Sequence, residues 1–524
     1  MMKRRLYAPS LGAVLALWLS TGTAVAADPI DSNSALSGNG GGCYSPPIVQ
    51  ASPFDQLPAV NPEWAPVVNG QVPFSAPVLV HGMAVDSHVS REDFPAGHVR
   101  FDQNTDIALD PADAHLLATG NLAPSNLVGG VPVMELEWET GSYPAWAWAG
   151  DGDRIVALGR WIFDCGHPDP IPGHKAGTSI PCLTDSDPPA GLACVGAVFN
   201  YRSEMHPPQA VAVIRSGKAA RLADTGRAVP VTQADVFVSP DGGGAGDACV
   251  VTHKRSVDEI IGAPCFPLGA PLALIPAGGT SPLNSTDFAF DVPLPAVAGG
   301  RNPVLRVIPH PTTPVPANLE VTPHLDGANP HYHVTVRMTQ PMGRHLPTGF
   351  AATLLAGWQQ APASPLVHIR VAFDGVVVND ALKTPLPGLG VPAGWKMEAN
   401  VNGEWQEVGG LGAVTASSAG QFTATPAAFD MFVPRSGAVT LHADAASGNC
   451  VDTMFGQSLL TDLARLGFQL GLECLGAIER DAGSVEVSFA APKFGVSDVP
   501  YEVASSTRAY TLRFRVERVE DAGS

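Results

Sequence analysis

Short runs in which apolar and polar residues alternate dominate the chain. They are long enough for strands, and examples are "MELEWE" (134–139), "RIVALGRWIF" (154–163), "HYHVTV" (331–336) and "YTLRFRVERV" (510–519). Breakers rich in Gly and Pro, such as "SPDGGGAGD" (239–247), separate these runs. Helical periodicity is convincing only from Phe455 to Leu472. The pattern therefore predicts a mainly β, multi-domain chain built as a β-sandwich or β-barrel, with one helical segment near the C-terminus.

Changes in composition suggest where domains begin and end. Residues 27–70 are rich in Gly, Pro and Ser and indicate an extended leader. Breakers near residues 280 and 345 then divide the remainder into an N-terminal β region (71–280), a connecting β segment (281–345) and a C-terminal β-sandwich (346–524).

The first residues carry an export signal. Lys3, Arg4 and Arg5 precede an apolar stretch, and Ala24-Val25-Ala26 offers a small-residue cleavage site. This order is typical of a secretory signal peptide spanning residues 1–26. No later segment is apolar for long enough to predict a transmembrane helix. We therefore expect a secreted or periplasmic protein.

The charge narrows the range of partners. The formal net charge is −19, and loss of the three basic residues of the signal peptide makes it −22. Such an acidic surface disfavours nucleic acid and anionic membranes. It fits divalent cations or, more simply, colloidal solubility, and the partner we expect is an extracellular substrate or ligand of unknown identity.

Eight cysteines in an exported chain predict disulfide bonds. Spacing suggests the local pairs Cys182/Cys194, Cys249/Cys265 and Cys450/Cys474, which would leave Cys43 with Cys165. Spacing does not fix the connectivity, because eight cysteines can pair in many ways.

The candidate chemistry lies where two strands meet turns. Asp164 and His167 end the run "RWIFDCGH", and Glu204 and His206 follow in "YRSEMHPP". Imidazole and carboxylate together suit a divalent metal such as zinc or manganese, with calcium a weaker fit. In this hypothesis Asp164, His167 and His206 bind the metal, while Glu204 binds it or acts as the catalytic base.

A purely structural interpretation of these residues stays open. Asp164 would then cap the turn at Gly166, His206 would bond a backbone carbonyl, and Glu204 would pair with Arg160 or Arg202.

Two further acidic groups lie upstream. Asp102, Asn104 and Asp106 share one face of a strand, which favours a solvated polar face over a calcium loop, because the EF-hand Gly and Glu are missing. Glu135, Glu137 and Glu139 also share a face. The simplest expectation puts these acids in water, and the alternative is that one of them joins the Asp164/His167 group.

Aromatic and histidine clusters allow other functions. Trp146 and Trp148 share a face, which fits core packing or a platform for sugar stacking. A later group of histidines suits a metal site but is more typical of an exposed surface: His310, His324, His331, His333 and His345.

The segments "GDRIVALGRWIFDCGHPDP" and "YRSEMHPPQAVAV" resemble a group of uncharacterised secreted bacterial proteins. That group shares a Gly-Arg-Trp strand, an Asp-Cys-Gly-His turn and a later Glu-x-His-Pro-Pro. The resemblance covers roughly residues 98–215. It implies a shared β-fold and a shared site, and it transfers no activity.

Familiar signatures of serine hydrolases, zincins and nucleotide enzymes are absent from the sequence. We therefore expect an exported metal-dependent hydrolase acting on an extracellular substrate. The alternative is a non-catalytic secreted or surface-associated protein that binds calcium or carbohydrate.

Overall fold

The structure is a computed structural model. It describes residues 64–66, 78–89, 103–138, 143–164, 170–183, 187–222, 228–238, 287–310, 319–337, 350–362, 366–379, 393–408, 412–414, 420–422, 428–434, 438–448, 480–490 and 500–519.

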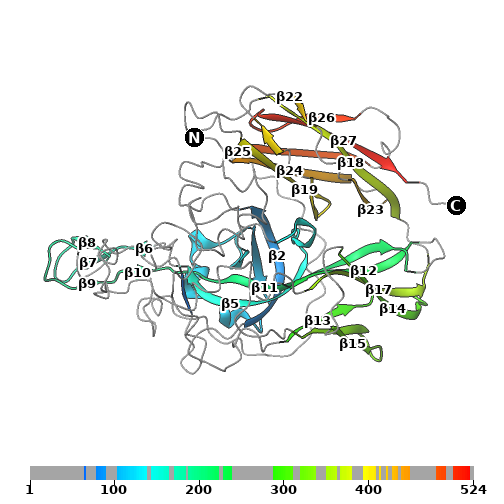
Figure 1. Ribbon diagram of the computed structural model, residues 1–524. Coiled ribbons are helices and arrows are strands. Elements are labelled where there is room, and N and C mark those ends of the chain that lie inside the picture. The colour runs from blue at the N-terminus through cyan, green and yellow to red at the C-terminus, as the bar shows by residue number, and fades with distance from the viewer. Residues whose placement is uncertain are drawn as a thin grey trace, which may run out of the picture.

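One large sheet organises the first two thirds of the chain (Figure 1). Its nine strands, in spatial order, are β1 (Trp64–Pro66), β5 (Arg154–Asp164), β2 (Val78–Val89), β3 (Gln103–Leu109), β4 (Met134–Trp138), β11 (Ser203–Ala220), β12 (Val229–Val238), β17 (Phe350–Gln360) and β14 (Arg301–Pro309). All neighbours are antiparallel except β4 and β11, which run parallel. β5 pairs with β11 as well as with β2, so this part of the sheet curls back on itself.

Smaller elements surround the sheet. A three-stranded sheet has the order β13 (Phe288–Pro293), β16 (His331–Val336) and β15 (Leu319–His324). Short pairings join β10 (Val198–Phe199) to β6 (Pro170–Ile171), and β7 (Gly173–Lys175) to β8 (Pro181–Cys182) and β9 (Cys194–Val195). Single 3₁₀ turns are η3 (Ala114–Leu116), η4 (Thr119–Leu122), η5 (Pro124–Asn126) and η7 (Ala145–Ala147).

Two prolines interrupt the ladder of β11. Its pairing with β5 shifts register between Met205 and Pro208 and again between Pro208 and Ala210. Proline has no backbone N–H to donate, so bulges are expected at Pro207-Pro208. The first three residues of β11 therefore form a separate short ladder, which contains Glu204.

Alternation along the strands sorts side chains onto two faces of the curled sheet. In β4, Met134, Leu136 and Trp138 are buried in an apolar core, and the glutamates between them face the other way. A second core lies where the far end of the sheet packs on the three-stranded sheet, and it includes Phe288, Val334 and Leu354.

The C-terminal third forms two further sheets, at the top of Figure 1. One contains β22 (Gly420–Phe422), β18 (Leu366–Val378), β27 (Tyr510–Arg518), β26 (Tyr501–Ala504) and β23 (Ala428–Pro434). The other contains β20 (Glu404–Glu407), β19 (Ala393–Val401), β24 (Ala438–Gly448), β25 (Arg480–Ala490) and β21 (Gly412–Val414). A single apolar core takes residues from both sheets, including Val371, Phe514 and Leu441, and this is the layered packing typical of a sandwich.

A hairpin joins this C-terminal unit to the curled sheet. Asn402 and Gly403 link β19 to β20 with positive φ angles of 50° and 83°, as a two-residue hairpin turn requires. Beyond the turn, the buried ring of Trp405 lies 5.4 Å from that of Trp148 and belongs to the core beneath β4. Glu404 accepts an ion-pair hydrogen bond from Lys218 of β11.

The expectation of a mainly β chain is confirmed. The Cys182–Cys194 disulfide is also confirmed, and it links β8 to β9. β14 and β17 belong to the nine-stranded sheet, which therefore includes strands on both sides of the breaker near residue 345. Within the described residues, no helix is long and apolar enough to cross a membrane.

Several expectations lie outside the described residues. They concern the signal peptide (1–26), the helix at 455–472 and these six cysteines: Cys43, Cys165, Cys249, Cys265, Cys450 and Cys474.

Candidate metal centre

Strand register gathers polar side chains on the face of the curled sheet opposite its apolar core. Asp86 of β2 pairs with Asp106 of β3, which pairs with Glu135 of β4, and Glu135 pairs with Glu204 of β11. One step along, His88 pairs with Asn104, which pairs with Glu137. Cross-strand partners point to the same side of a sheet, so these side chains form two neighbouring rows. We call them the polar face.

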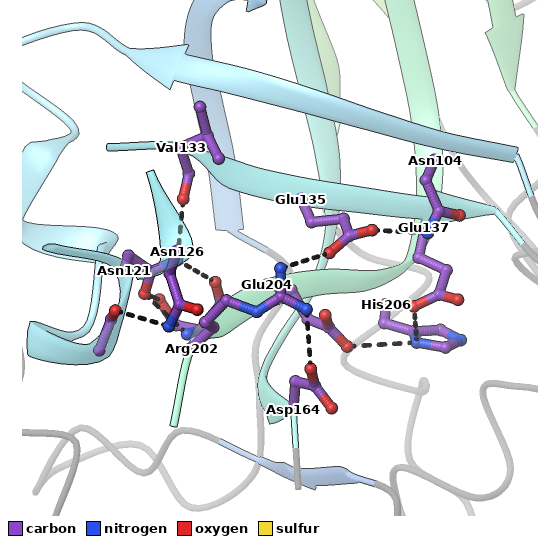
Figure 2. Close-up of polar contacts among 12 residues, drawn as sticks. Asn104, Asn121, Asn126, Val133, Glu135, Glu137, Asp164, Arg202, Glu204 and His206 are labelled. Carbon is purple, nitrogen blue, oxygen red and sulfur yellow. Dashed lines mark hydrogen bonds and ion pairs between the residues drawn. The ribbon is translucent and has the colours of Figure 1, made fainter. Parts of the chain in front are cut away.

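Glu137, Glu204 and His206 converge at one end of the polar face (Figure 2). His206 Nδ1 lies 3.1 Å from Glu137 Oε2 and 3.4 Å from Glu204 Oε1. One possible ligand atom from each residue lies within 4.8 Å of the other two. Glu204 and His206 are 2% and 1% exposed, so these charges are almost wholly removed from bulk water.

Arg202 stands beside this trio and holds two other carboxylates. It forms an ion pair with Glu135 Oε2 at 3.1 Å and donates to Asp164 Oδ2 at 3.0 Å (Figure 2). Burial opposes the charged guanidinium, but the Glu135 and Asp164 carboxylates outweigh that cost and raise the pKa of Arg202 above its usual range. Arg202 therefore stays cationic and is fixed between β4 and the end of β5.

A buried asparagine fixes the backbone that carries these groups. The Asn121 carboxamide accepts from Ser203 N at 2.8 Å and donates to Ser203 O at 2.9 Å. It also donates to Val133 O at 2.8 Å and accepts from Ala118 N at 2.9 Å. Ser203 precedes Glu204, and Val133 lies two residues before Glu135. Asn121 thus ties the starts of β4 and β11 together.

Asn104 leaves one polar atom without a hydrogen bond. Its Nδ2 donates to Glu135 Oε1, but its Oδ1 is buried and has no hydrogen-bond partner in the part of the chain that the structure describes. Asn104 is 5% exposed and is the cross-strand partner of Glu137. A buried amide oxygen without a partner is costly, and it is an oxygen ligand suited to a cation.

Carboxylates outnumber cations on the polar face. Five acids lie on it (Asp86, Asp106, Glu135, Glu137 and Glu204), and the basic groups that contact them among the described residues are Arg202 and the imidazoles of His88 and His206. Burial raises the pKa of Asp106 to about 7, and the nearby Glu135 carboxylate adds to this rise. Burial also raises the pKa of Glu204, with Asp164 adding to the rise. Without a bound cation, the polar face keeps part of its acid protonated.

Asp86, His88 and Asp106 form a second group of metal-ligand type. His88 Nδ1 lies 3.0 Å from Asp86 Oδ2. This hydrogen bond is the main reason why the pKa of Asp86 is lowered and that of His88 is raised. Asp86 and His88 are about half exposed, so this group lies at the solvent edge of the polar face.

The structure brings together only part of the predicted site. Glu204 and His206 touch, and Glu137 joins them. Asp164 lies close enough to influence Glu204 but is held by Arg202, and His167 lies outside the described residues. Alternation in "MELEWE" was the available signal for Glu137, because it put all three glutamates on one face.

Other predicted clusters have different surroundings. Asn104 and Asp106 are buried, so the expectation of a solvated face does not hold for them. Trp148 is buried and its Nε1 donates to Tyr143 O, which matches core packing. Trp146 stacks on His310 with ring centroids 3.5 Å apart.

Comparisons with known proteins add no assignment. No family model matches the chain, and no curated protein matches it. Among solved structures, a chain of extended synaptotagmin 2 that comprises its SMP domain and two C2 domains is similar at 8% identity and a TM-score of 0.18, over 84% of this chain and 89% of that one. A TM-score this low supports no argument about fold or function.

Proposed function

We propose that the chain is an exported, metal-dependent hydrolase that acts on an extracellular substrate. The observation that carries the proposal is the convergence of Glu137, Glu204 and His206 from two adjacent strands, with ligand atoms within 4.8 Å. The export signal in residues 1–26 supports an extracellular or periplasmic substrate.

The chemistry of the donors fits a divalent cation. Two carboxylates and one imidazole suit zinc or manganese. Asn104, the cross-strand partner of Glu137, offers a further oxygen, because its Oδ1 has no hydrogen-bond partner among the described residues. Calcium fits less well, because it prefers oxygen ligands alone. The excess of buried carboxylates also favours a cation, since a bound metal would balance charge that otherwise requires protons.

The surrounding residues suit hydrolysis. When bound, a metal of this kind activates water and polarises a scissile bond. Arg202, fixed by Glu135 and Asp164, keeps a permanent positive charge beside the trio that can stabilise developing negative charge. Burial raises the pKa of Glu204 toward the neutral pH at which the protein works, and a general base is most effective when its pKa lies near that pH. Glu204 therefore serves either as a ligand or as the base.

The first experiment is elemental analysis of the untagged mature protein, purified without added metal. We expect the wild type to carry one more equivalent of zinc or manganese than His206→Ala and Glu137→Gln do. The control is Glu486→Gln, because Glu486 is a highly exposed glutamate on β25. Wild-type protein should then hydrolyse one class in a panel of ester, phosphodiester and glycoside substrates. Equal zinc and manganese contents in the wild type and in both variants, even after incubation with these metals, would refute the proposal.

A non-catalytic role is the second candidate. The near-complete burial of Glu204 and His206 favours it, since a structural cation needs no open position for substrate. In that case the protein would retain metal and lose stability on chelation, but no substrate would turn over.

A further inference from the structure

The three-stranded sheet β13–β16–β15 presents histidines on its outer face. This sheet lies at the lower edge of the molecule in Figure 1. Along β16, Tyr332, Val334 and Val336 are buried in the core, so His331 and His333 point outward. Register sets His324 of β15 opposite His331, and Asp291 of β13 opposite His333. Three imidazoles and one carboxylate thus share a single face.

The rings lie close enough to serve one ion. The centroid of the His324 ring is 5.0 Å from that of His331 and 6.2 Å from that of His333. Two imidazoles bound to one tetrahedral metal at about 2.0–2.1 Å have their ring centres roughly 5–6 Å apart. The strand pairing brings the three rings to this spacing. The His324 and His331 rings are stacked at an interplanar angle of 14°, so both side chains must rotate before their nitrogens can share one ion.

Hydrogen bonds also determine which nitrogen of each imidazole ring can coordinate a metal ion. His333 Nδ1 lies 2.8 Å from Asp291 Oδ1, and His331 Nδ1 lies 2.9 Å from the carbonyl oxygen of Asn329. Both partners only accept, so Nδ1 carries the proton in each ring and Nε2 keeps its lone pair. Metal-binding histidines are commonly oriented in this way by a carboxylate or a carbonyl.

We propose that His324, His331 and His333 bind a divalent transition-metal ion at the protein surface, with Asp291 as a positioning residue. Imidazole nitrogen favours zinc, copper and nickel over calcium and magnesium. Asp291 Oδ2 lies 3.7 Å from His331 Nε2, so the carboxylate also supplies negative charge next to the ion. Side chains here are 28% exposed for His331 and 41% for His333, so an ion can enter from solvent.

This surface site stands independently of the buried trio. The two sites share no residue, and they belong to different sheets. Failure of one proposal therefore leaves the other untouched, and variants at each site distinguish them.

The test is calorimetric titration of untagged, metal-stripped mature protein with zinc chloride at about pH 7.5, above the ordinary imidazole pKa of roughly 6.5. We expect the double variant His331→Gln/His333→Gln to lose one zinc equivalent. His324→Gln should weaken that equivalent at least tenfold, and Asp291→Asn about tenfold. His206→Ala should retain it. The control His174→Gln removes an exposed histidine from β7 and should match the wild type.

Zinc binding by the double variant with wild-type stoichiometry and affinity would overturn the proposal. Thermal melting of each metal-free variant should match that of the wild type, because these side chains face solvent. A variant that melts normally but has lost zinc therefore reports on ligation and not on folding.

Discussion

His206 Nδ1 lies 3.1 Å from Glu137 Oε2, although the two residues come from strands far apart in the sequence. The contact depends on the parallel pairing of β4 with β11, which sets Glu204 beside Glu135 and brings His206 next to Glu137. Glu204, two residues before His206 on β11, completes the trio. Its function can be tested separately.

Glu204→Gln distinguishes a ligand from a catalytic base. If Glu204 is a ligand, the variant should bind zinc or manganese at least tenfold more weakly, because a neutral amide replaces a carboxylate. If it is the base, metal affinity should change little while turnover falls about 10²–10⁴-fold. Metal titration and steady-state kinetics on the same preparation separate the two. Unchanged affinity together with unchanged turnover would exclude both functions.

Arg202→Met should destabilise the metal-free protein by about 3–5 kcal/mol, because Asp164 and Glu135 would stay buried without their cation. Urea unfolding at neutral pH measures this change. Arg337→Met is the matched control: that arginine forms its ion pairs on the exposed surface, where water screens them, so its loss should change stability far less than the loss of Arg202. If both substitutions lowered the unfolding free energy equally, burial of the Arg202 ion pairs would not explain the destabilisation.

The sequence predicted which side chains share one face of a strand, but it did not predict which strands pair with one another. Alternation placed the glutamates of "MELEWE" on one face and the apolar residues on the other, as β4 has them. It could not show that β4 pairs with β11, because that pairing depends on how the sheet curls through the β5–β11 contact. Nor could it show that Asn104 and Asp106 are buried, since alternation says nothing about what covers a face.

The same limit applies to domain organisation. Breakers near residue 345 suggested a boundary, yet β17 follows them and pairs with β12 and β14 in the large sheet. A Pro/Gly-rich connection ends a strand locally, whereas membership of a sheet is decided by long-range pairing. For Cys182 and Cys194 the pairing is local, and there the spacing sufficed.

Asn121→Ala should cost about 3–5 kcal/mol of unfolding free energy. The change leaves backbone groups at Ser203, Val133 and Ala118 without their bonds in a buried location, and each such group costs roughly 1–3 kcal/mol. Denaturant unfolding followed by tryptophan fluorescence measures it. The control Asn126→Ala removes one partly buried bond to Gly120 O and should cost about 1 kcal/mol. If Asn121→Ala is no worse than the control, the asparagine does not hold β4 and β11 together.

The pH dependence of stability should report on the acids of the polar face. In the metal-free protein the pKa of Asp106 is raised to about 7, whereas an unfolded aspartate has its ordinary value near 3.8. Between these values the folded state binds the extra proton, so its stability falls as the pH rises from about 4 to about 7. Asp86, Glu135, His88 and Arg202 also act on this carboxyl, so the wild-type curve alone mixes several titrations.

Asp106→Asn isolates the contribution of this carboxyl, because asparagine imitates the protonated acid at every pH. We expect the variant to match the wild type near pH 4 and to become more stable than it toward pH 8, by up to about 3–4 kcal/mol. Urea unfolding of both proteins in the presence of a chelator measures the difference. A gap that stays constant with pH would mean that Asp106 ionises normally. Added zinc or manganese should reduce this difference in unfolding free energy, by stabilising the wild type, only if the ion contacts Asp106. The titration therefore shows whether the group Asp86, His88 and Asp106 shares the cation of the buried trio.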